Sequence, residues 1–206
     1  MKKYNLTFIS IVFLVLPIFL LLMGDFKERT LLKDSISILT IIAFCLMSGQ
    51  LFLNRNYRKI RHDMKMSSVV KIHKFIGYSF LVVLLVHPFL IVVPRFFESG
   101  VEPIDAFMTI ITTFNSLGVI LGIIAWCLLL VLGITSMFRN KLKFSYKTWR
   151  VFHGILAFAF IVFAVWHVID LGRHINFLMS VYLIAIAFFG IVLLLNTYLF
   201  NSSTRV

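Results

Sequence analysis

The amino-acid sequence predicts an all-α integral membrane protein that folds as a six-helix bundle. Hydrophobic residues make up 61% of the 206 positions, and the mean hydropathy is +1.01. Six apolar runs reach or approach the length of about 20 residues that a helix needs to cross the hydrocarbon core of a bilayer. Since no segment between these runs is long enough for a soluble domain, we expect a single transmembrane domain over residues 1–206.

The first candidate span, residues 6–23, follows Lys2 and Lys3 and therefore has the charge pattern of a secretory signal peptide. Its apolar stretch is long, however, and no small-residue cleavage motif follows Met23. We therefore expect an uncleaved first helix.

The remaining apolar runs cover residues 35–53, 70–93, 117–138, 151–169 and 177–200. The third and fifth spans each contain two histidines, while the fourth has glycines at Gly118 and Gly122, a spacing typical of helix packing in membranes. Cys45 and Cys127 lie inside spans without a motif partner, so we expect both to be packing residues. The longest gap, residues 54–69, is a short basic loop.

The net charge of +12 is explained by orientation in the membrane, not by nucleic-acid binding. With the N-terminus inside, fifteen of the twenty cations fall on one side, and seven of the eight acids, including Glu98, Glu102 and Asp105, fall on the other. Short basic loops stay in the cytoplasm. We therefore expect a multi-pass protein of a bacterial cytoplasmic membrane, with both termini cytoplasmic and the lipid bilayer as its surroundings.

Four of the six histidines form two pairs with equal spacing inside the predicted spans. His73 and His87 share the third span, and His153 and His167 share the fifth. Fourteen positions along an α-helix rise about 21 Å and turn to within about 40° of the starting direction, so both members of a pair face the same side near opposite membrane faces. If the two helices lie side by side, His73 opposes His153 and His87 opposes His167.

Opposed imidazoles at two depths predict two b-type hemes. Neutral imidazole is a good ligand for iron, and a b-type heme needs no covalent attachment. We therefore predict four iron ligands, His73, His87, His153 and His167, and no catalytic residue. A proton relay, a non-heme metal site and ordinary hydrogen-bonded core histidines are the alternatives.

Residues around the four histidines are open to more than one interpretation. Gly77 and Gly154 lie beside predicted ligands, where a missing side chain would let a porphyrin approach the backbone, although glycine also serves plain helix packing. His62 and His174 fall in predicted loops, and we expect them to be solvated.

Ligation of an iron by two histidines would leave it no free position for oxygen or substrate, which favours outer-sphere electron transfer. With one site near each membrane face, electrons would enter from the cytoplasm and leave to an external acceptor such as ferric iron. A heme-free transporter or assembly factor is the alternative from a different class of protein.

Two segments resemble the ferric-reductase-like transmembrane domain, a superfamily that includes ferric reductases and NADPH oxidases. They are Ile72-His73-Lys74-Phe75-Ile76-Gly77-Tyr78 through to His87, and Trp149-Arg150-Val151-Phe152-His153-Gly154 through to Trp166-His167. The resemblance covers about residues 35–200. It implies a diheme cytochrome b in which His73 and His153 hold the inner heme, and His87 and His167 hold the outer one.

Complete enzymes of that superfamily carry a cytoplasmic flavin and nicotinamide domain after the last span, and this sequence shows no G-x-G-x-x-G motif before its end at Val206. We therefore expect an oxidoreductase component whose FAD or FMN sits only on a partner, a cytoplasmic flavin reductase or another electron donor.

Two related functions stay open. The heme-binding membrane subunit of the periplasmic methionine sulfoxide reductase system is also short, but its inner ligand on the equivalent of the third span is commonly missing, whereas His73 is present here. A quinol-oxidising cytochrome b has paired ligands at similar spacing.

Overall fold

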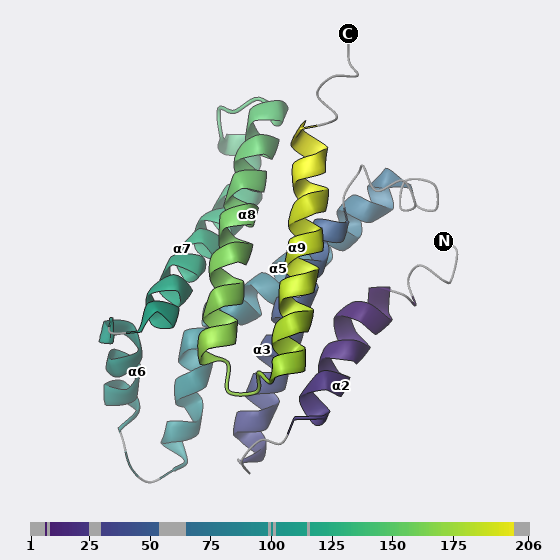
Figure 1. Cartoon of the computed structure of the whole chain (residues 1–206). Helices are drawn as coiled ribbons and strands as arrows, with labels where there is room; N and C mark the ends of the chain where they lie inside the picture. Colours follow the sequence, from purple (N-terminus) through teal and green to yellow (C-terminus); the bar gives the residue numbers. More distant parts are fainter. Residues whose placement is uncertain are drawn as a thin grey trace.

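The structure, a computed structural model, describes residues 7, 9–24, 30–53, 65–98, 100, 102–114 and 116–199. All regular structure in these residues is helical, so the predicted all-α class is confirmed for the described part of the chain. Figure 1 shows the long helices side by side in one bundle.

Five helices are long and apolar enough to cross a membrane. They begin and end within a few residues of five of the predicted spans and are α3 (Leu31–Gly49), α5 (Met66–Val92), α7 (Leu117–Met137), α8 (Tyr146–Leu171) and α9 (Phe177–Leu199). The chain is therefore a multi-pass membrane protein. Local sequence explains the early start of α8, because the Ser145 hydroxyl accepts a hydrogen bond from Thr148 N at 3.1 Å.

The first predicted span differs from the other five. Its described part contains a π-helical turn, η1 (Ile11–Val15), that continues into α2 (Leu16–Leu22), and this apolar helix is shorter than a membrane span. Pro17 lacks the N–H that would bond the carbonyl four residues earlier, and the irregular π turn lies just before it. The prediction of six long helices is thus replaced by five within the described residues, and a crossing by residues 6–23 stays a prediction.

The short first helix is nevertheless tied to the bundle. Tyr182 Oη donates to Val12 O at 2.8 Å, and Asn176 Nδ2 donates to Leu20 O at 3.3 Å. Both donors lie on or beside α9, so η1 and α2 pack against the last helix as well as against α3.

A further helix, α6 (Pro103–Thr112), lies where the sequence predicted only an acidic loop. Pro103 stands at its first turn, where a missing N–H costs nothing. Phe107 stacks on Phe89 of α5 with ring centroids 5.0 Å apart, which fixes α6 against the end of that helix. Ten residues rise only about 15 Å, too short for a membrane crossing and too short to stand out as a span in the sequence.

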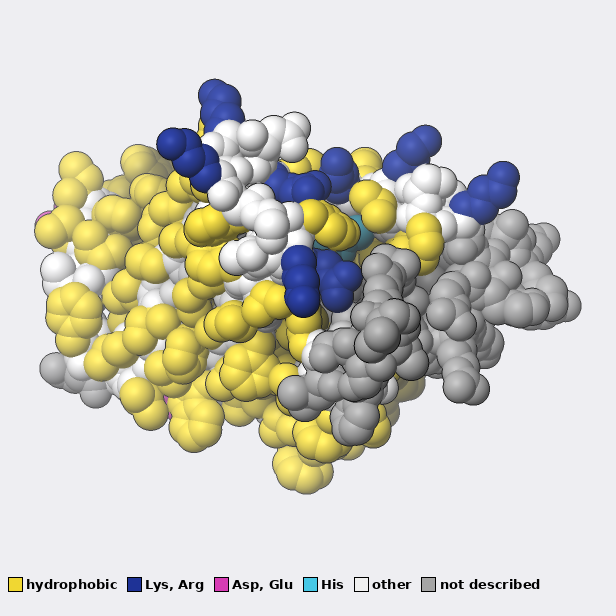
Figure 2. Space-filling view, turned by 90° about the horizontal axis from the view of Figure 1, so that it is seen from above, with side chains coloured by type: hydrophobic (Ala, Val, Ile, Leu, Met, Phe, Trp, Pro, Cys, Tyr) yellow, Lys and Arg dark blue, Asp and Glu magenta, His cyan; other side chains and the backbone are white. Residues whose placement is uncertain are grey.

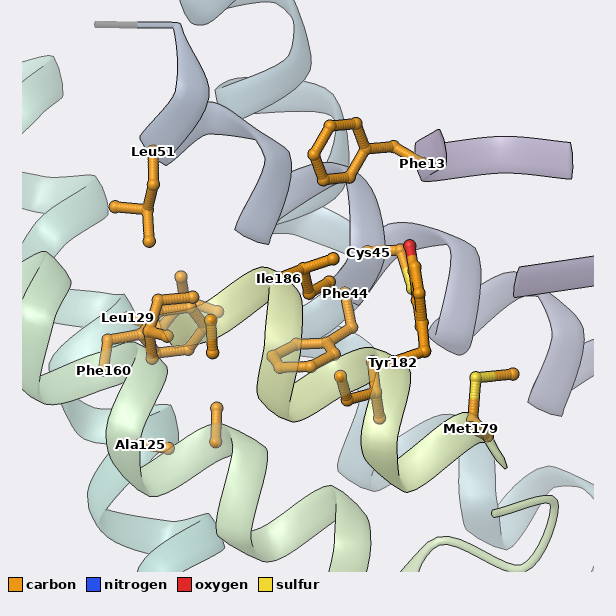
Figure 3. Packing of buried hydrophobic residues seen from close by; sticks show 14 of the residues in the cluster. Phe13, Phe44, Cys45, Leu51, Ala125, Leu129, Phe160, Met179, Tyr182 and Ile186 are labelled. Atoms are coloured by element: carbon orange, nitrogen blue, oxygen red, sulfur yellow. The ribbon is translucent and has the colours of Figure 1, made fainter. Parts of the chain in front are cut away.

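The buried core joins α3, α7, α8 and α9. Figure 3 shows Phe44 and Cys45 of α3 beside Tyr182 of α9, with Leu129 and Phe160 packed together from α7 and α8. Cys45 is buried, as predicted, but Cys127 is exposed, which corrects its assignment as a packing residue. Many large apolar side chains lie on the outside of the bundle, as expected for a surface in contact with lipid.

The two histidine helices begin at the same end of the bundle. Figure 2 looks onto this end and shows Lys and Arg side chains gathered there. It contains the starts of α5 and α8 and the end of α7, so α5 and α8 run parallel to each other with α7 antiparallel to both. Parallel helices bring the first histidines of the two pairs to one level and the second histidines to the other.

Candidate functional site

His73 of α5 and His153 of α8 face each other near the basic end. Their ring centroids are 6.3 Å apart and the rings are tilted by 68°. An imidazole nitrogen binds a metal at about 2.0 Å and lies about 1.1 Å from its own ring centroid, so two imidazoles on opposite sides of one ion have centroids about 6 Å apart. The observed separation therefore fits two rings that share a single iron.

The two histidine helices are not packed closely against each other. α5 packs mainly against α3, and α8 packs mainly against α7. Trp126 of α7 donates from Nε1 to Leu85 O at 2.9 Å and so connects α7 to α5 near His87. It is the histidine side chains that extend toward each other from α5 and α8.

His87 of α5 and His167 of α8 are the second pair, one helical level away from the first. His167 Nδ1 lies 2.9 Å from the carbonyl oxygen of Gly118 on α7. A Cβ at Gly122 would lie 2.6 Å from His167 Cε1 and closer still to Nδ1. Glycine at this position therefore lets the α7 backbone approach the imidazole.

His87 differs from the other three histidines of the two pairs. Its Nδ1 is buried, and it has no hydrogen-bond partner within the described part of the chain. Pro88 follows it inside α5 and removes one backbone N–H from the helix ladder. The second pair thus combines one imidazole fixed by a backbone carbonyl with one whose buried Nδ1 has no partner among the described residues.

Gln50 is the site residue that sequence reasoning missed. It lies where α3 passes into the 3₁₀ turn η2 (Gln50–Phe52). With its amide nitrogen toward α5, Gln50 donates to His73 Nδ1 at 2.7 Å and to His73 O at 3.0 Å. A signal was available, because this is the only glutamine in the chain and it interrupts an apolar span, where a polar side chain needs partners.

The surroundings of His153 are polar and aromatic. Ser136 Oγ lies 3.4 Å from His153 Nδ1. Trp149 stacks on the His153 ring with centroids 5.1 Å apart, and the Arg139 guanidinium lies 4.9 Å from the Trp149 ring. These contacts fix the imidazole against the first turn of α8.

Two glycines near the histidines serve protein packing. A Cβ at Gly77 would lie 3.5 Å from the Gln50 amide, and a Cβ at Gly154 would lie 2.7 Å from ring carbons of Tyr198 on α9. Tyr198 Oη donates to Arg150 O at 2.6 Å. Of the two interpretations, the structure favours helix and side-chain packing over a close approach of a porphyrin.

His174 corrects the expectation of a solvated loop histidine. It is buried between α8 and α9, with Nε2 3.3 Å from Asp34 Oδ1 at the start of α3. The loop folds back onto the bundle, which the sequence pattern did not indicate. His62, also predicted to be solvated, lies outside the described residues.

The donor set favours a cofactor that needs only two protein ligands. Across the described residues, no group of three or more His, Cys, Asp or Glu side chains could hold a bare metal ion. Histidines arranged in facing pairs suit a heme iron, because the porphyrin supplies the other four nitrogens. The His73–His153 pair therefore has the facing arrangement that a heme iron with two protein ligands requires.

The fold and these pairs define a polytopic membrane protein with a histidine pair at each of two levels. The chain belongs to the family described as ferric reductase like transmembrane component, whose match covers residues 39–164. An uncharacterized protein from Archaeoglobus fulgidus is 42% identical over 163 residues, which is 79% of this chain and 88% of that protein. No solved structure matches the chain.

Proposed function

We propose that this membrane component carries electrons across the bilayer with two b-type hemes, one held by His73 and His153 and the other by His87 and His167. The observation that carries the proposal is the His73–His153 separation of 6.3 Å, which suits two imidazoles on one iron. Bound heme supplies an iron that accepts and releases single electrons.

The surroundings of His167 support an imidazole prepared for ligation. A carbonyl oxygen only accepts hydrogen bonds, so the Gly118 carbonyl requires a proton on His167 Nδ1 and leaves Nε2 with its lone pair. Histidines that bind metals commonly donate their other N–H to such a partner, which fixes the ring and raises its basicity.

The proposed direction of transfer follows from charge. We place the basic end, where α5 and α8 begin, in the cytoplasm of a bacterial cell membrane, with both termini on that side. The donor would be a flavin reductase that carries FAD or FMN, docking at the basic end. The acceptor, ferric iron or another external oxidant, would meet the opposite end. A membrane potential that is negative inside assists outward electron flow by about 2.3 kcal/mol per 100 mV.

Optical spectroscopy with quantified heme tests the proposal. The purified protein should show a Soret band, a reduced α-band and two hemes per chain. His73→Ala or His153→Ala should reduce the ratio to one, and His87→Ala or His167→Ala should do the same through the other pair. His62→Ala is the matched control, because His62 belongs to neither pair. A protein that binds no heme, or four alanine variants that all retain two, would refute the assignment.

The identity of the electron donor and of the electron acceptor distinguishes the proposed function from the two related functions. Reduction of the hemes by a flavin reductase and reoxidation by a ferric chelate outside sealed vesicles would support it. Reduction by a quinol would favour a quinol-oxidising cytochrome b. Reoxidation only by a periplasmic methionine sulfoxide reductase would favour that system.

A further inference from the structure

We infer that Gln50 is a positioning residue for the inner heme site, and that its side-chain amide rotates by a half-turn when His73 binds iron. This inference rests on the proposed function. It adds a positioning residue from the turn η2 that follows α3, a part of the chain that supplies none of the four proposed ligands.

The first amide orientation suits a His73 that is not bound to iron. Here the Gln50 amide nitrogen donates to His73 Nδ1 at 2.7 Å and to His73 O at 3.0 Å, while its oxygen accepts from Gly77 N at 3.3 Å. A donor facing Nδ1 requires that nitrogen to be unprotonated. The single proton of the neutral imidazole is then on Nε2, the nitrogen that a heme iron would need.

Binding of iron at Nε2 therefore requires the proton to be on Nδ1. A protonated Nδ1 needs an acceptor, and the atom 2.7 Å away must then be the amide oxygen. In that second orientation the Gln50 amide nitrogen donates to Met47 Sδ at 3.1 Å. In this second orientation the amide oxygen also faces the His73 carbonyl oxygen at 3.0 Å and the amide nitrogen faces Gly77 N at 3.3 Å, so it is favourable only when Nδ1 of His73 carries a proton.

The second orientation also tunes the iron ligand. An acceptor on Nδ1–H increases the electron density that Nε2 offers, and outer partners of this kind typically change metal affinity by about 10- to 100-fold when they are removed. A more basic ligand stabilises the oxidised iron and lowers its reduction potential. Gln50 should therefore influence the reduction potential of the inner heme without changing that of the outer heme.

Two substitutions of opposite character test this role by redox titration of the heme-loaded protein. Gln50→Glu supplies a permanent acceptor and should lower one midpoint, whereas Gln50→Met removes the acceptor at similar size and should raise the same midpoint. We expect about a tenfold change in the equilibrium constant for each, which equals 59 mV for one electron. The other midpoint should not move.

Ser48→Ala is the matched control, because Ser48 is buried near the end of the preceding helix α3 and its hydroxyl bonds only the carbonyl of Phe44 among the described contacts. It should leave both midpoints unchanged. If Gln50 has a purely structural role, the two substitutions should shift the midpoint potential in the same direction or leave it unchanged. Either result would overturn the inference. If Gln50→Met does not fold, an unchanged or raised midpoint in Gln50→Glu would by itself contradict the inference.

The wild-type protein offers a test without mutation. Since Gln50 is the only glutamine, cell-free synthesis with glutamine labelled at its side-chain carbonyl carbon places one infrared reporter at this site. Loading with hemin should lower the frequency of that carbonyl band, because Oε1 exchanges the long hydrogen bond from Gly77 N at 3.3 Å for the shorter one from His73 Nδ1 at 2.7 Å. If the protein holds two hemes and the band does not shift, the inference about Gln50 is wrong but the proposed function stands. If the protein binds no heme, the proposed function itself is wrong.

Discussion

His167 Nδ1 donates to the backbone carbonyl of Gly118 at 2.9 Å, a bond between two adjacent antiparallel helices. The contact is possible because Gly122 has no side chain where the imidazole lies, while the missing side chain of Gly118 makes room for Asp170 and Leu171 of α8. The orientation of one proposed ligand is thereby determined by the packing of α7 on α8, the closest helix pair in the bundle.

Gly122→Ala should disrupt the outer pair selectively. The new Cβ would lie 2.6 Å from His167 Cε1, so the ring must move and its bond to Gly118 O must break. We expect the heme content to fall from two per chain to about one, because a misplaced ligand commonly costs 10-fold or more in affinity.

Gly133→Ala is the control for that experiment. It lies on the same helix, and its Cβ would meet Leu81 Cδ1 at 2.8 Å, the end of a side chain that can move aside. If the Gly122→Ala protein keeps two hemes and wild-type spectra, His167 tolerates the added methyl group, and the predicted clash is refuted.

Gly154→Ala should destabilise the contact between α8 and α9. Its Cβ would lie 2.7 Å from ring carbons of Tyr198, and overpacking of this kind costs about 1–3 kcal/mol. Thermal unfolding in detergent should show a lowered midpoint, and adding Tyr198→Leu should recover part of the loss. Tyr198→Phe alone removes the bond to Arg150 O at a cost of about 1 kcal/mol. If the loss in the double variant equals the sum of the losses in Gly154→Ala and Tyr198→Leu alone, the glycine and the tyrosine act independently and the predicted contact is refuted.

The Lys33–Glu98 pair predicts a specific loss of stability in acid. Lys33 Nζ lies 2.6 Å from Glu98 Oε2, and this hydrogen bond lowers the pKa of Glu98 below its ordinary value. A pKa that is lower in the folded than in the unfolded protein gives a stabilising contribution that is complete above about pH 5 and disappears as the pH falls through the folded pKa.

Glu98→Gln should therefore flatten the acid side of the stability profile, with its largest effect at neutral pH. The effect will be small because the pair is partly exposed. Glu102→Gln removes the same charge nearby and serves as the comparison in thermal unfolding between pH 3 and 7. An identical acid response in the two variants would count against a role for the Lys33 contact.

Heme removal should lower the stability of the whole bundle. Protein made under heme limitation should take up hemin with an increase in melting temperature, since a ligand at 100 times its Kd stabilises by about 2.7 kcal/mol. The increase should be reduced in a His73→Ala, His153→Ala double variant, which keeps only the outer pair. If hemin raises the melting temperature of that variant as much as it does in the wild-type protein, hemin binds at another place.

Much of the fold was predictable because it depends on local patterns. Continuous apolar runs of membrane length predicted five of the long helices, and the fourteen-residue spacing placed both histidines of each helix on one face. The clustering of basic residues gave the relative direction of α5 and α8, and hence which histidines would face each other. The meeting of His73 with His153 agrees with that prediction.

What the sequence did not predict depends on contacts between distant segments. Gln50 reaches His73 from another helix, and no helical period reveals such a contact. His174 is buried because its loop folds onto Asp34, and Gly154 is required by Tyr198. Helix α6 was missed because a helix of ten residues in an acidic segment does not have the length of a membrane span. These features come from tertiary packing, which overrides local pattern.

Each facing histidine pair joins residues 80 positions apart in the chain. A growing polypeptide therefore displays His73 and His87 well before their counterparts have been synthesised, and neither level can be completed until α8 has entered the bilayer. Because chains are made from the N-terminus at about 5–20 residues per second, several seconds of translation separate the two halves. Under the proposed function, heme insertion is consequently expected to be a late step in biogenesis, one that follows assembly of nearly the entire bundle.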